Sequence, residues 1–167
     1  MKTIAVFNVE HVTPEEAASF RIRKAVRVVV RDTSGNIAVI HATRPGFHEL
    51  PGGGVEDRES FEETVIRECK EEIGCNVVIE KEIGLITEYR KLENLTKESY
   101  CYLARVQGEK GEINPMEDEI DLDMEIKWVS LDEAKRLIEG YQKELSYKAA
   151  FSIQRDVTFL EEAKKLI

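Results

Sequence analysis

The most constraining segment of this chain is the stretch Gly53–Cys75, which reads GGVEDRESFEETVIRECKEEIGC. Within it, Ser60 is followed three residues later by Glu63, which is the spacing of a capping box at the start of a helix. Gly74 is a typical residue at which a helix ends, because glycine adopts the left-handed conformation without strain. The segment therefore predicts a helix over residues 61–73.

Three glutamates are grouped on one side of this expected helix. At about 100° per residue, Glu68, Glu71 and Glu72 fall within roughly one 100° sector of its surface. Like charges at this spacing repel each other and destabilise a helix, so replacing Glu71 with Gln is expected to stabilise the metal-free protein. A hard divalent cation with oxygen ligands is the natural compensating group. An acidic face that only meets solvent is the plainer interpretation, because the chain is 34% charged.

The neighbouring face of the helix is apolar and is expected to be buried: Val65, Ile66, Cys69 and Ile73. The chain contains three cysteines, Cys69, Cys75 and Cys101, an odd number without the spacing of a metal site. Free cysteines pack as small hydrophobic residues, so we expect buried, reduced thiols. No histidine is placed near them in the sequence to activate a nucleophilic cysteine.

The complete pattern of the segment fixes seven positions: Gly53, Glu59, Arg67, Glu68, Glu71, Glu72 and Gly74. At roughly 6–7% usage for each residue, such a match arises by chance on the order of once in a million chains. The stretch resembles the box of Nudix hydrolases, and Leu50–Gly53 and Trp128–Glu133 extend the resemblance on either side. Cys69 and Cys75 depart from it, because the family prefers large aliphatic residues there. The resemblance implies an α/β fold, namely an α/β/α sandwich with a mixed sheet and a central box helix.

The resemblance also implies a chemistry: a Mg²⁺- or Mn²⁺-dependent enzyme that cleaves a nucleotide diphosphate bond (NDP-X to NMP and P-X) by attack of water at phosphorus. Such a reaction requires positioning and neutralisation of charge on the phosphate oxygens. The implied metal ligands and catalytic groups are Glu68, Glu71 and Glu72, and Glu68 is expected to assist deprotonation of the water. The carbonyl group of Gly52 is implied as a further ligand, with Gly53 close to the metal.

Two further sets of residues follow from the resemblance. Glu59 and Arg67 are expected to form an internal salt bridge that supports the site, with Arg67 off the carboxylate sector. The family often takes another metal ligand from a downstream acidic loop, and here Glu119 is the candidate, with Glu117 and Asp121 as alternatives. A solvated acidic loop explains each of these three residues as well.

Substrate specificity has weaker signals in the sequence. Arg44, Phe47 and His48 precede the box and are candidates for contacts with a base or a phosphate group, although packing or a surface position explains them equally well. No proline occurs between Pro51 and Pro115, so the proline that ADP-ribose hydrolases of the family carry shortly after the box is missing. Nucleoside triphosphates, including oxidised deoxynucleotides, are therefore favoured as substrates. The alternatives are a nucleotide sugar and a catalytically silent nucleotide-binding or sensor module, which a broken box would favour.

Length and charge limit the remaining possibilities. A chain of 167 residues suits one domain, 1–167, in which residues 1–20 form an N-terminal extension of unclear role. The net charge of −9 argues against a nucleic-acid partner, because binding to a phosphate backbone needs clustered lysine and arginine, and the sequence shows no basic stripe. The apolar run Ile4–Val9 is too short for a membrane span. We therefore expect a cytoplasmic monomer or homodimer that acts on a small nucleotide.

Apolar patterns and turn signals predict the order of the other elements. Strands are expected at residues 3–12, 21–31, 37–42, 76–92, 98–107 and 125–130. Further helices are expected at residues 14–20, 131–139 and 146–165. The turn at 32–36 is expected to join its two flanking strands as a hairpin, and residues 43–48 are expected to form a loop.

Overall fold

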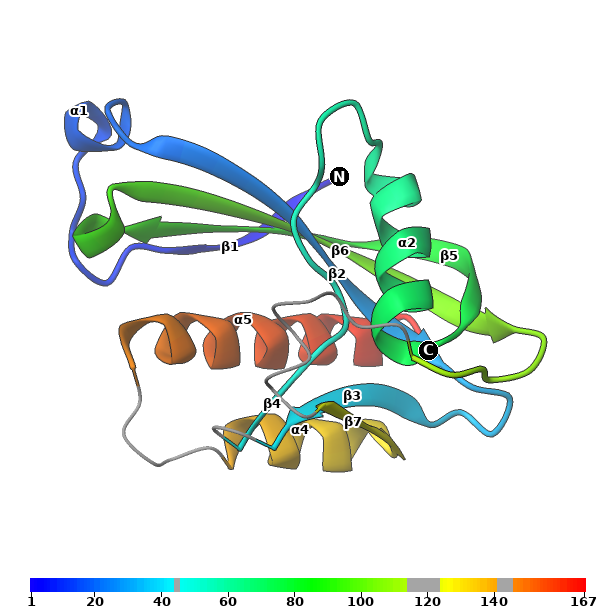
Figure 1. The fold of residues 1–167 in the computed structure, drawn as a ribbon. Helices are drawn as coiled ribbons and strands as arrows, with labels where there is room; N and C mark the ends of the chain where they lie inside the picture. Colours follow the sequence, from blue (N-terminus) through cyan, green and yellow to red (C-terminus); the bar gives the residue numbers. More distant parts are fainter. Residues whose placement is uncertain (44–45, 114–123, 141–145) are drawn as a thin grey trace.

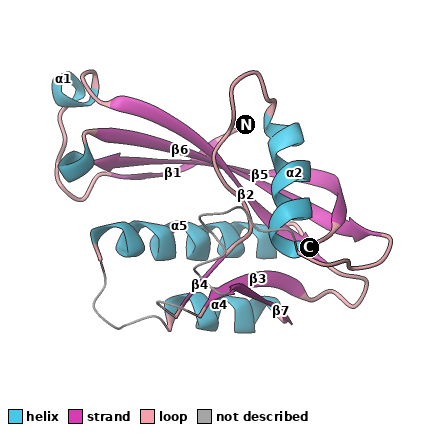
Figure 2. Cartoon of the chain, in the orientation of Figure 1, coloured by secondary structure: helices cyan, strands magenta, loops and turns pink. Residues whose placement is uncertain are grey.

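The computed structural model describes residues 1–43, 46–113, 124–140 and 146–167. Its strands are β1 (Thr3–Phe7), β2 (Arg21–Arg31), β3 (Ile37–Ala42), β4 (Phe47–Glu49), β5 (Asn76–Arg90), β6 (Leu95–Gln107) and β7 (Met124–Val129). Its helices are α1 (Pro14–Ala17), α2 (Phe61–Ile73), a short 3₁₀ helix (Lys91–Glu93), α4 (Leu131–Glu139) and α5 (Tyr147–Lys164). The strands form one mixed sheet in the order β1-β5-β6-β2-β3-β4, with β7 also paired to β3. Helix α2 lies on one side of the sheet, and α5 lies on the other with α4 beside it (Figures 1 and 2).

The two strands expected to form a hairpin diverge immediately after their turn. β2 and β3 pair at Arg31 and Ile37, whereas β2 runs parallel to β6 along its whole length. The edge of β2 that β3 leaves is occupied by the glycine-rich segment 51–55, where the Val26 amide donates to the Gly53 carbonyl at 2.9 Å. The hairpin prediction therefore holds only for the residue pair next to the turn. Beyond that pair, the segment that leads into α2 takes the place of β3.

Alternating residues of β2 contribute to two hydrophobic cores on opposite faces of the sheet. Val26 and Val28 are fully buried beneath α2, in a core that also contains Cys69 and Ile73. Val29 lies in the second core, which the sheet forms with α4 and α5. The α/β/α sandwich expected from the sequence is confirmed.

Helix α2 has the predicted bounds, a capping box at its start and Gly74 at its end with a φ of 63°. Val65, Cys69 and Ile73 are buried as predicted, but Ile66 is not. Ile66 is 49% exposed, whereas Glu68 and Glu72 are buried together with Val65. The arc that faces the sheet is shifted towards the glutamates, so Ile66, about 100° beyond Val65, lies at its margin.

Several other element boundaries differ from those expected. The first strand ends at Phe7 because the Asn8 side chain accepts a hydrogen bond from the Val12 amide at 2.7 Å and turns the chain. The first helix is a single turn, and β4 occupies the end of the segment expected to be a loop. Strand β6 begins at Leu95 instead of residue 98.

Residues 1–20 are attached to the sheet. β1 pairs in parallel with β5, and Phe7 is buried in the core that α5 covers. A search for membrane-crossing helices over the described ranges finds none that is both long and apolar enough.

The three cysteines are buried and unpaired, as expected. Burial raises the pKa of the Cys69 and Cys101 thiols well above the usual range. A thiol held in this neutral form is a poor nucleophile, so the cysteines serve as core residues.

Candidate active site

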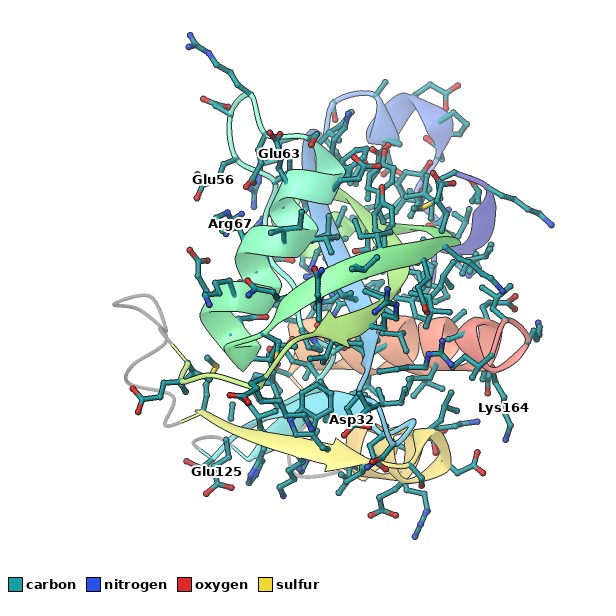
Figure 3. All side chains as sticks on the ribbon, turned by 90° about the vertical axis from the view of Figure 1, so that its right-hand side faces the viewer. Asp32, Glu56, Glu63, Arg67, Glu125 and Lys164 are labelled. Atoms are coloured by element: carbon teal, nitrogen blue, oxygen red, sulfur yellow. The ribbon has the colours of Figure 1, made fainter. Side chains whose placement is uncertain are left out.

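Arg67 joins the carboxylates of α2 to the loop that precedes the helix. Its Nε and Nη2 atoms donate to the two oxygens of Glu59 at 2.9 and 3.0 Å, which is the salt bridge implied by the resemblance. Its Nη1 atom also donates to Glu68 at 2.9 Å and to Glu71 at 3.1 Å. Although position 67 lies beside the carboxylate sector of the helix, the long side chain of Arg67 reaches Glu71 one turn further on. Figure 3 shows Arg67 beside the first turns of α2 and the loop that carries Glu56.

Glu59 holds Arg67 in place as a permanent anion. Besides the two bonds from Arg67, its carboxylate accepts hydrogen bonds from the Thr64 hydroxyl at 2.8 Å and the Glu56 amide at 3.2 Å. Hydrogen bonding to Arg67 is the largest cause that lowers the pKa of Glu59 to about 2. Glu59 and Arg67 thus join the loop before α2 to two carboxylates of the helix.

The other two carboxylates of α2 contact the glycine-rich segment. Glu68 packs directly on Gly53, where an added Cβ would lie 2.2 Å from its Oε1 atom. Glu72 accepts a hydrogen bond from the Gly52 amide at 2.6 Å. Gly52 has a φ of +130°, and an added Cβ would lie 2.4 Å from the Val26 carbonyl oxygen. At Gly52 the sheet backbone approaches too closely for a side chain, whereas at Gly53 an added Cβ would meet the end of the Glu68 side chain.

The buried carboxylates lack a full set of compensating charges. Burial raises the pKa of Glu72 to about 8 and raises the pKa of Glu68, while the Arg27 guanidinium opposes both shifts. Arg67 contacts Glu68 and Glu71 but forms no hydrogen bond with Glu72 within the described chain. A cation bound here would therefore favour the charged form of Glu72.

A hard divalent cation fits this donor set. Carboxylate oxygens are the ligands that such ions prefer, and Glu68, Glu71 and Glu72 are supplied by one rigid helix. In the described ranges no three acidic, histidine or cysteine side chains already converge closely enough to hold a metal ion. Glu119, the expected downstream ligand, lies outside the described residues, as do its two alternatives.

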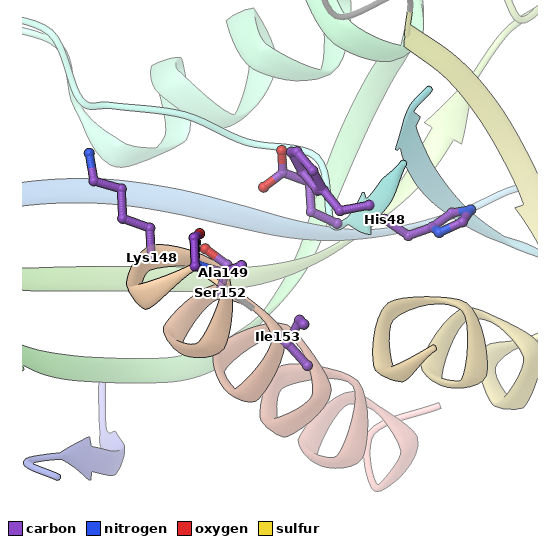
Figure 4. Close-up of a pocket in the computed structure, with 8 residues that line it drawn as sticks. His48, Lys148, Ala149, Ser152 and Ile153 are labelled. Atoms are coloured by element: carbon purple, nitrogen blue, oxygen red, sulfur yellow. Dashed lines mark hydrogen bonds between the residues drawn. The ribbon is translucent and has the colours of Figure 1, made fainter. Parts of the chain in front are cut away.

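Two of the three residues predicted to contact substrate line one cavity. Phe47 and His48 border a space of about 180 Å³ between β4 and the first turns of α5, where Ser152 and Ile153 form the opposite wall (Figure 4). Burial lowers the pKa of His48 to about 4, so its ring is neutral at physiological pH. Arg44, the third candidate, lies outside the described residues.

Six basic residues that the sequence did not single out line a second pocket, here called the cationic pocket: Arg21, Arg23, Arg27, Arg90, Lys97 and Lys148. This pocket has a volume of about 280 Å³ and borders Gly53 and Gly54. Arg21, Arg23 and Arg27 at alternate positions of β2 are its sequence signal, because alternate residues of a strand share one face. The basic residues of the other elements join this face through long-range packing, which the local sequence does not reveal.

A buried ion pair on α5 fixes the start of the glycine-rich segment. Asp156 is fully buried, accepts a hydrogen bond from the Leu50 amide at 3.1 Å and is bonded to Arg155 Nε at 2.7 Å. No local pattern distinguishes these residues from the surface charges of a terminal helix. Their role becomes evident in the folded chain, where α5 covers the segment.

A mixed sheet between helical layers, with a glutamate-bearing helix held beneath a glycine-rich segment, defines the class of Nudix proteins. A family profile described as the NUDIX domain matches residues 21–150. The chain therefore belongs to the Nudix family and is a Nudix hydrolase.

Solved structures with this fold agree with the assignment. The MutT protein from Methanosarcina mazei Go1 is 22% identical over 87% of this chain and 97% of its own, with a TM-score of 0.57. The E. coli ORF135 protein is 20% identical, covers 89% and 93% of the two chains and has a TM-score of 0.60. An Ap4A hydrolase from C. elegans is 17% identical, covers 86% and 96%, and has a TM-score of 0.61. A search of curated protein sequences found no match.

Proposed function

We propose that the chain is a Mg²⁺- or Mn²⁺-dependent diphosphohydrolase that converts NDP-X to NMP and P-X, with nucleoside triphosphates, including oxidised ones, as its substrate class. One observation carries the proposal: two buried carboxylates, Glu68 and Glu72, lie against Gly53 and Gly52, and of the two only Glu68 has an ion pair within the described chain, with Arg67. Such an arrangement costs stability in the absence of a ligand and is typical of a site that binds a cation and an anionic substrate.

The proposed metal ligands are Glu68, Glu71, Glu72 and the carbonyl group of Gly52, with Glu119 as a further ligand from the downstream loop. When bound, the metal neutralises charge on the phosphate oxygens and acidifies the attacking water. Arg67 holds Glu68 and Glu71 at fixed positions through its Nη1 atom. Gly54, where an added Cβ would lie 3.5 Å from the Arg23 guanidinium, leaves room for the phosphates to approach the backbone.

In the proposed reaction, the oxygen of a water molecule forms a bond to one phosphorus atom of the diphosphate. The bond between that phosphorus and the bridging oxygen breaks, and the bridging oxygen leaves with P-X. The proton released by the water passes to the carboxylate of Glu68, whose pKa is raised by burial. A carboxylate of raised pKa holds a proton more readily near neutral pH.

The cavity beside β4 is the proposed site of the nucleoside. Phe47 and Ile153 offer an apolar surface, and His48 stacks on His41 with ring centroids 4.3 Å apart. A flat, mostly apolar group such as a base suits a cavity with these walls. The proposed partner is therefore a small nucleotide and not a nucleic acid.

A screen of nucleoside triphosphates, nucleotide sugars and other nucleotide diphosphate derivatives with Mg²⁺ tests the proposal, with released phosphate measured after coupling to a phosphatase. The wild type is expected to hydrolyse at least one triphosphate. Glu68→Gln is expected to lose activity at least about 100-fold, whereas the exposed Glu109→Gln keeps it. If the wild type binds nucleotides but hydrolyses none of them, a silent binding module is favoured.

A further inference from the structure

The cationic pocket is built from one face of three paired strands. Arg21 and Arg23 of β2 pair with Leu95 and Lys97 of β6, and Arg90 of β5 pairs with Leu95. Paired residues of adjacent strands point to the same side of a sheet, so these basic side chains converge. Arg27, further along the same face of β2, and Lys148 of α5 complete the pocket.

Positive charge in the pocket exceeds the negative charge around it. Against its six basic residues stand three neighbouring carboxylates, Glu49, Glu88 and Glu93, which pair with Arg27, Arg90 and Lys148. Within the described part of the chain, no carboxylate forms an ion pair with the three remaining basic residues: Arg21, Arg23 and Lys97. A chain of net charge −9 thus concentrates unpaired cations at one place, which indicates an anionic ligand.

Arg27, which lines this pocket, has a hydrogen-bond donor without a partner in the described structure. Arg27 is 8% exposed, and its Nη1 and Nη2 atoms donate to the Val26 carbonyl and to Glu49. Its buried Nε atom has no hydrogen-bond partner in the described structure. Burial of an unpaired donor is unfavourable, so Arg27 is a costly residue in the wall of this pocket.

The environment of Lys97 also favours an anion in the pocket. Burial and the positive charges of Arg155 and Arg27 lower the pKa of Lys97 well below its usual range. A bound anion would offset this repulsion and stabilise the ammonium group. The position of Lys97 is therefore more favourable with an anion in the pocket than without one.

The cationic pocket adjoins the carboxylate site. Arg23 and Gly54 line the pocket and also line a neighbouring cavity of about 400 Å³ that contains Arg67 and Glu68. Gly53, on which Glu68 packs, borders the pocket as well. An anion in the pocket would therefore be continuous with a diphosphate held at the carboxylates.

We propose that the cationic pocket binds a phosphate group of the substrate in addition to the two phosphates joined by the cleaved bond. The proposal rests on the diphosphohydrolase function proposed above. A phosphate site in this pocket makes the enzyme selective for nucleoside triphosphates and longer polyphosphates. ADP-ribose, which carries two phosphates, would leave the pocket empty. Guanidinium groups bind phosphate oxygens in pairs, which suits the arginines of β2.

Binding of inorganic tripolyphosphate in EDTA, measured by titration calorimetry, tests the pocket without metal or catalysis. The test variant is Arg21→Gln/Lys97→Gln, because neither residue has an ion pair within the described chain, and Arg21 is exposed. The matched control is Arg136→Gln, a change of the same kind on α4 at a side chain that is 73% exposed. The test variant is expected to bind tripolyphosphate at least tenfold more weakly than the wild type, and the control is expected to bind it equally well. Thermal melting of all three proteins checks that they are folded.

Steady-state kinetics with Mg²⁺ then compare a nucleoside triphosphate with ADP-ribose. The test variant is expected to lose at least tenfold in kcat/KM for the triphosphate and less than twofold for ADP-ribose. Equal losses on both substrates, or equal tripolyphosphate affinity in the wild type and the variant, would overturn the pocket proposal. If the wild type hydrolyses nothing yet tripolyphosphate binding differs as expected, the hydrolase proposal fails and the anion site stands.

Discussion

Gly52 and Gly53 are neighbours, yet they are glycine for different reasons. A Cβ at Gly53 would meet the end of the Glu68 side chain, which is able to move aside. A Cβ at Gly52 would meet the backbone of Val26, and the φ of +130° is strained for any other residue. The first constraint concerns the geometry of a carboxylate, and the second concerns the fold.

We expect Gly53→Ala to fold and to lose activity, because the added methyl group displaces the Glu68 carboxylate from its position. A loss of about 100-fold in kcat/KM is expected, since a misplaced catalytic group has effects of this size. Gly52→Ala is expected to lower stability by at least about 2 kcal/mol. Chemical unfolding measures the expected loss of stability in Gly52→Ala, and steady-state kinetics measure the expected loss of activity in Gly53→Ala. A fully active Gly53→Ala enzyme would contradict the assignment of Glu68.

The predicted repulsion among the three glutamates is partly relieved by Arg67. Because Arg67 forms an ion pair with Glu71 at 3.1 Å, Glu71→Gln is no longer expected to stabilise the metal-free protein. The unrelieved charge is that of Glu72, whose pKa is raised to about 8. Its cost in free energy of unfolding grows as the pH rises from 4.5 to 8, since the folded state resists ionisation in this range.

Glu72→Gln is accordingly expected to stabilise the protein in EDTA at pH 7, by on the order of 1–3 kcal/mol. In Mg²⁺ this advantage is expected to be largely cancelled or reversed, because a metal at a hundredfold excess over its Kd adds about 2.7 kcal/mol to the wild type. Melting temperatures in EDTA and in Mg²⁺, measured beside Glu71→Gln, check this dependence on the metal. An equal Mg²⁺-induced shift in the wild type and in Glu72→Gln would exclude Glu72 as a ligand.

Between elements, the ion pair of Glu59 with Arg67 connects the loop that precedes α2 with the helix itself. The pKa of Glu59 is about 2 in the folded state and lies near 4.5 in an unfolded chain. The unfolded state therefore binds more protons between these values. Stabilisation by Glu59 is present above about pH 4.5 and is lost as the pH falls towards 2.

Glu59→Gln is expected to lower the free energy of unfolding at pH 7 by up to about 3 kcal/mol. The difference from the wild type should shrink steadily below pH 4.5. Urea unfolding at a series of pH values measures it, with the exposed Glu109→Gln as a control that changes stability little. A difference that does not depend on pH would show that lost packing, and not the charge of Glu59, is responsible.

Elements with local signals were predictable from the sequence. The capping box and Gly74 delimit α2, and β2 has its predicted bounds because its β-branched residues are suited to a buried strand. The divergence of β3 from β2 was not predictable, because it depends on the glycine-rich segment occupying that edge of β2. Arg90 and Asp156 reach the site through strand register and helix packing, which have no local signature.

At the scale of the whole molecule, residues 1–20 contribute to the same folded unit as the family domain. Ile4 packs where a side chain on Gly84 of β5 would otherwise lie. Glu10 accepts hydrogen bonds from the Lys91 amide at 2.8 Å and from the Tyr147 hydroxyl. The N-terminal segment thus connects the turn after β5 with the start of α5, where Lys148 lines the cationic pocket.

Phe7→Ala is therefore expected to destabilise the protein by about 3 kcal/mol or more, as for other buried aromatic residues. Val6→Ala is the matched control, because Val6 lies on the same strand and is 54% exposed; it should change stability by less than about 0.5 kcal/mol. Urea denaturation of both variants measures the effect. Equal, small changes would mean that β1 is dispensable for the fold.

The parallel pairing of β2 with β6 has a consequence for how quickly the protein forms. Residues 21–31 must pair with residues 95–105, which lie far away in the sequence, and contacts this distant slow folding to roughly milliseconds or seconds. The arginines of β2 and Lys97 of β6 come together only when this pairing has formed. Tripolyphosphate added during refolding should therefore bind only in the slowest phase. The appearance of phosphate binding then measures when β2 pairs with β6.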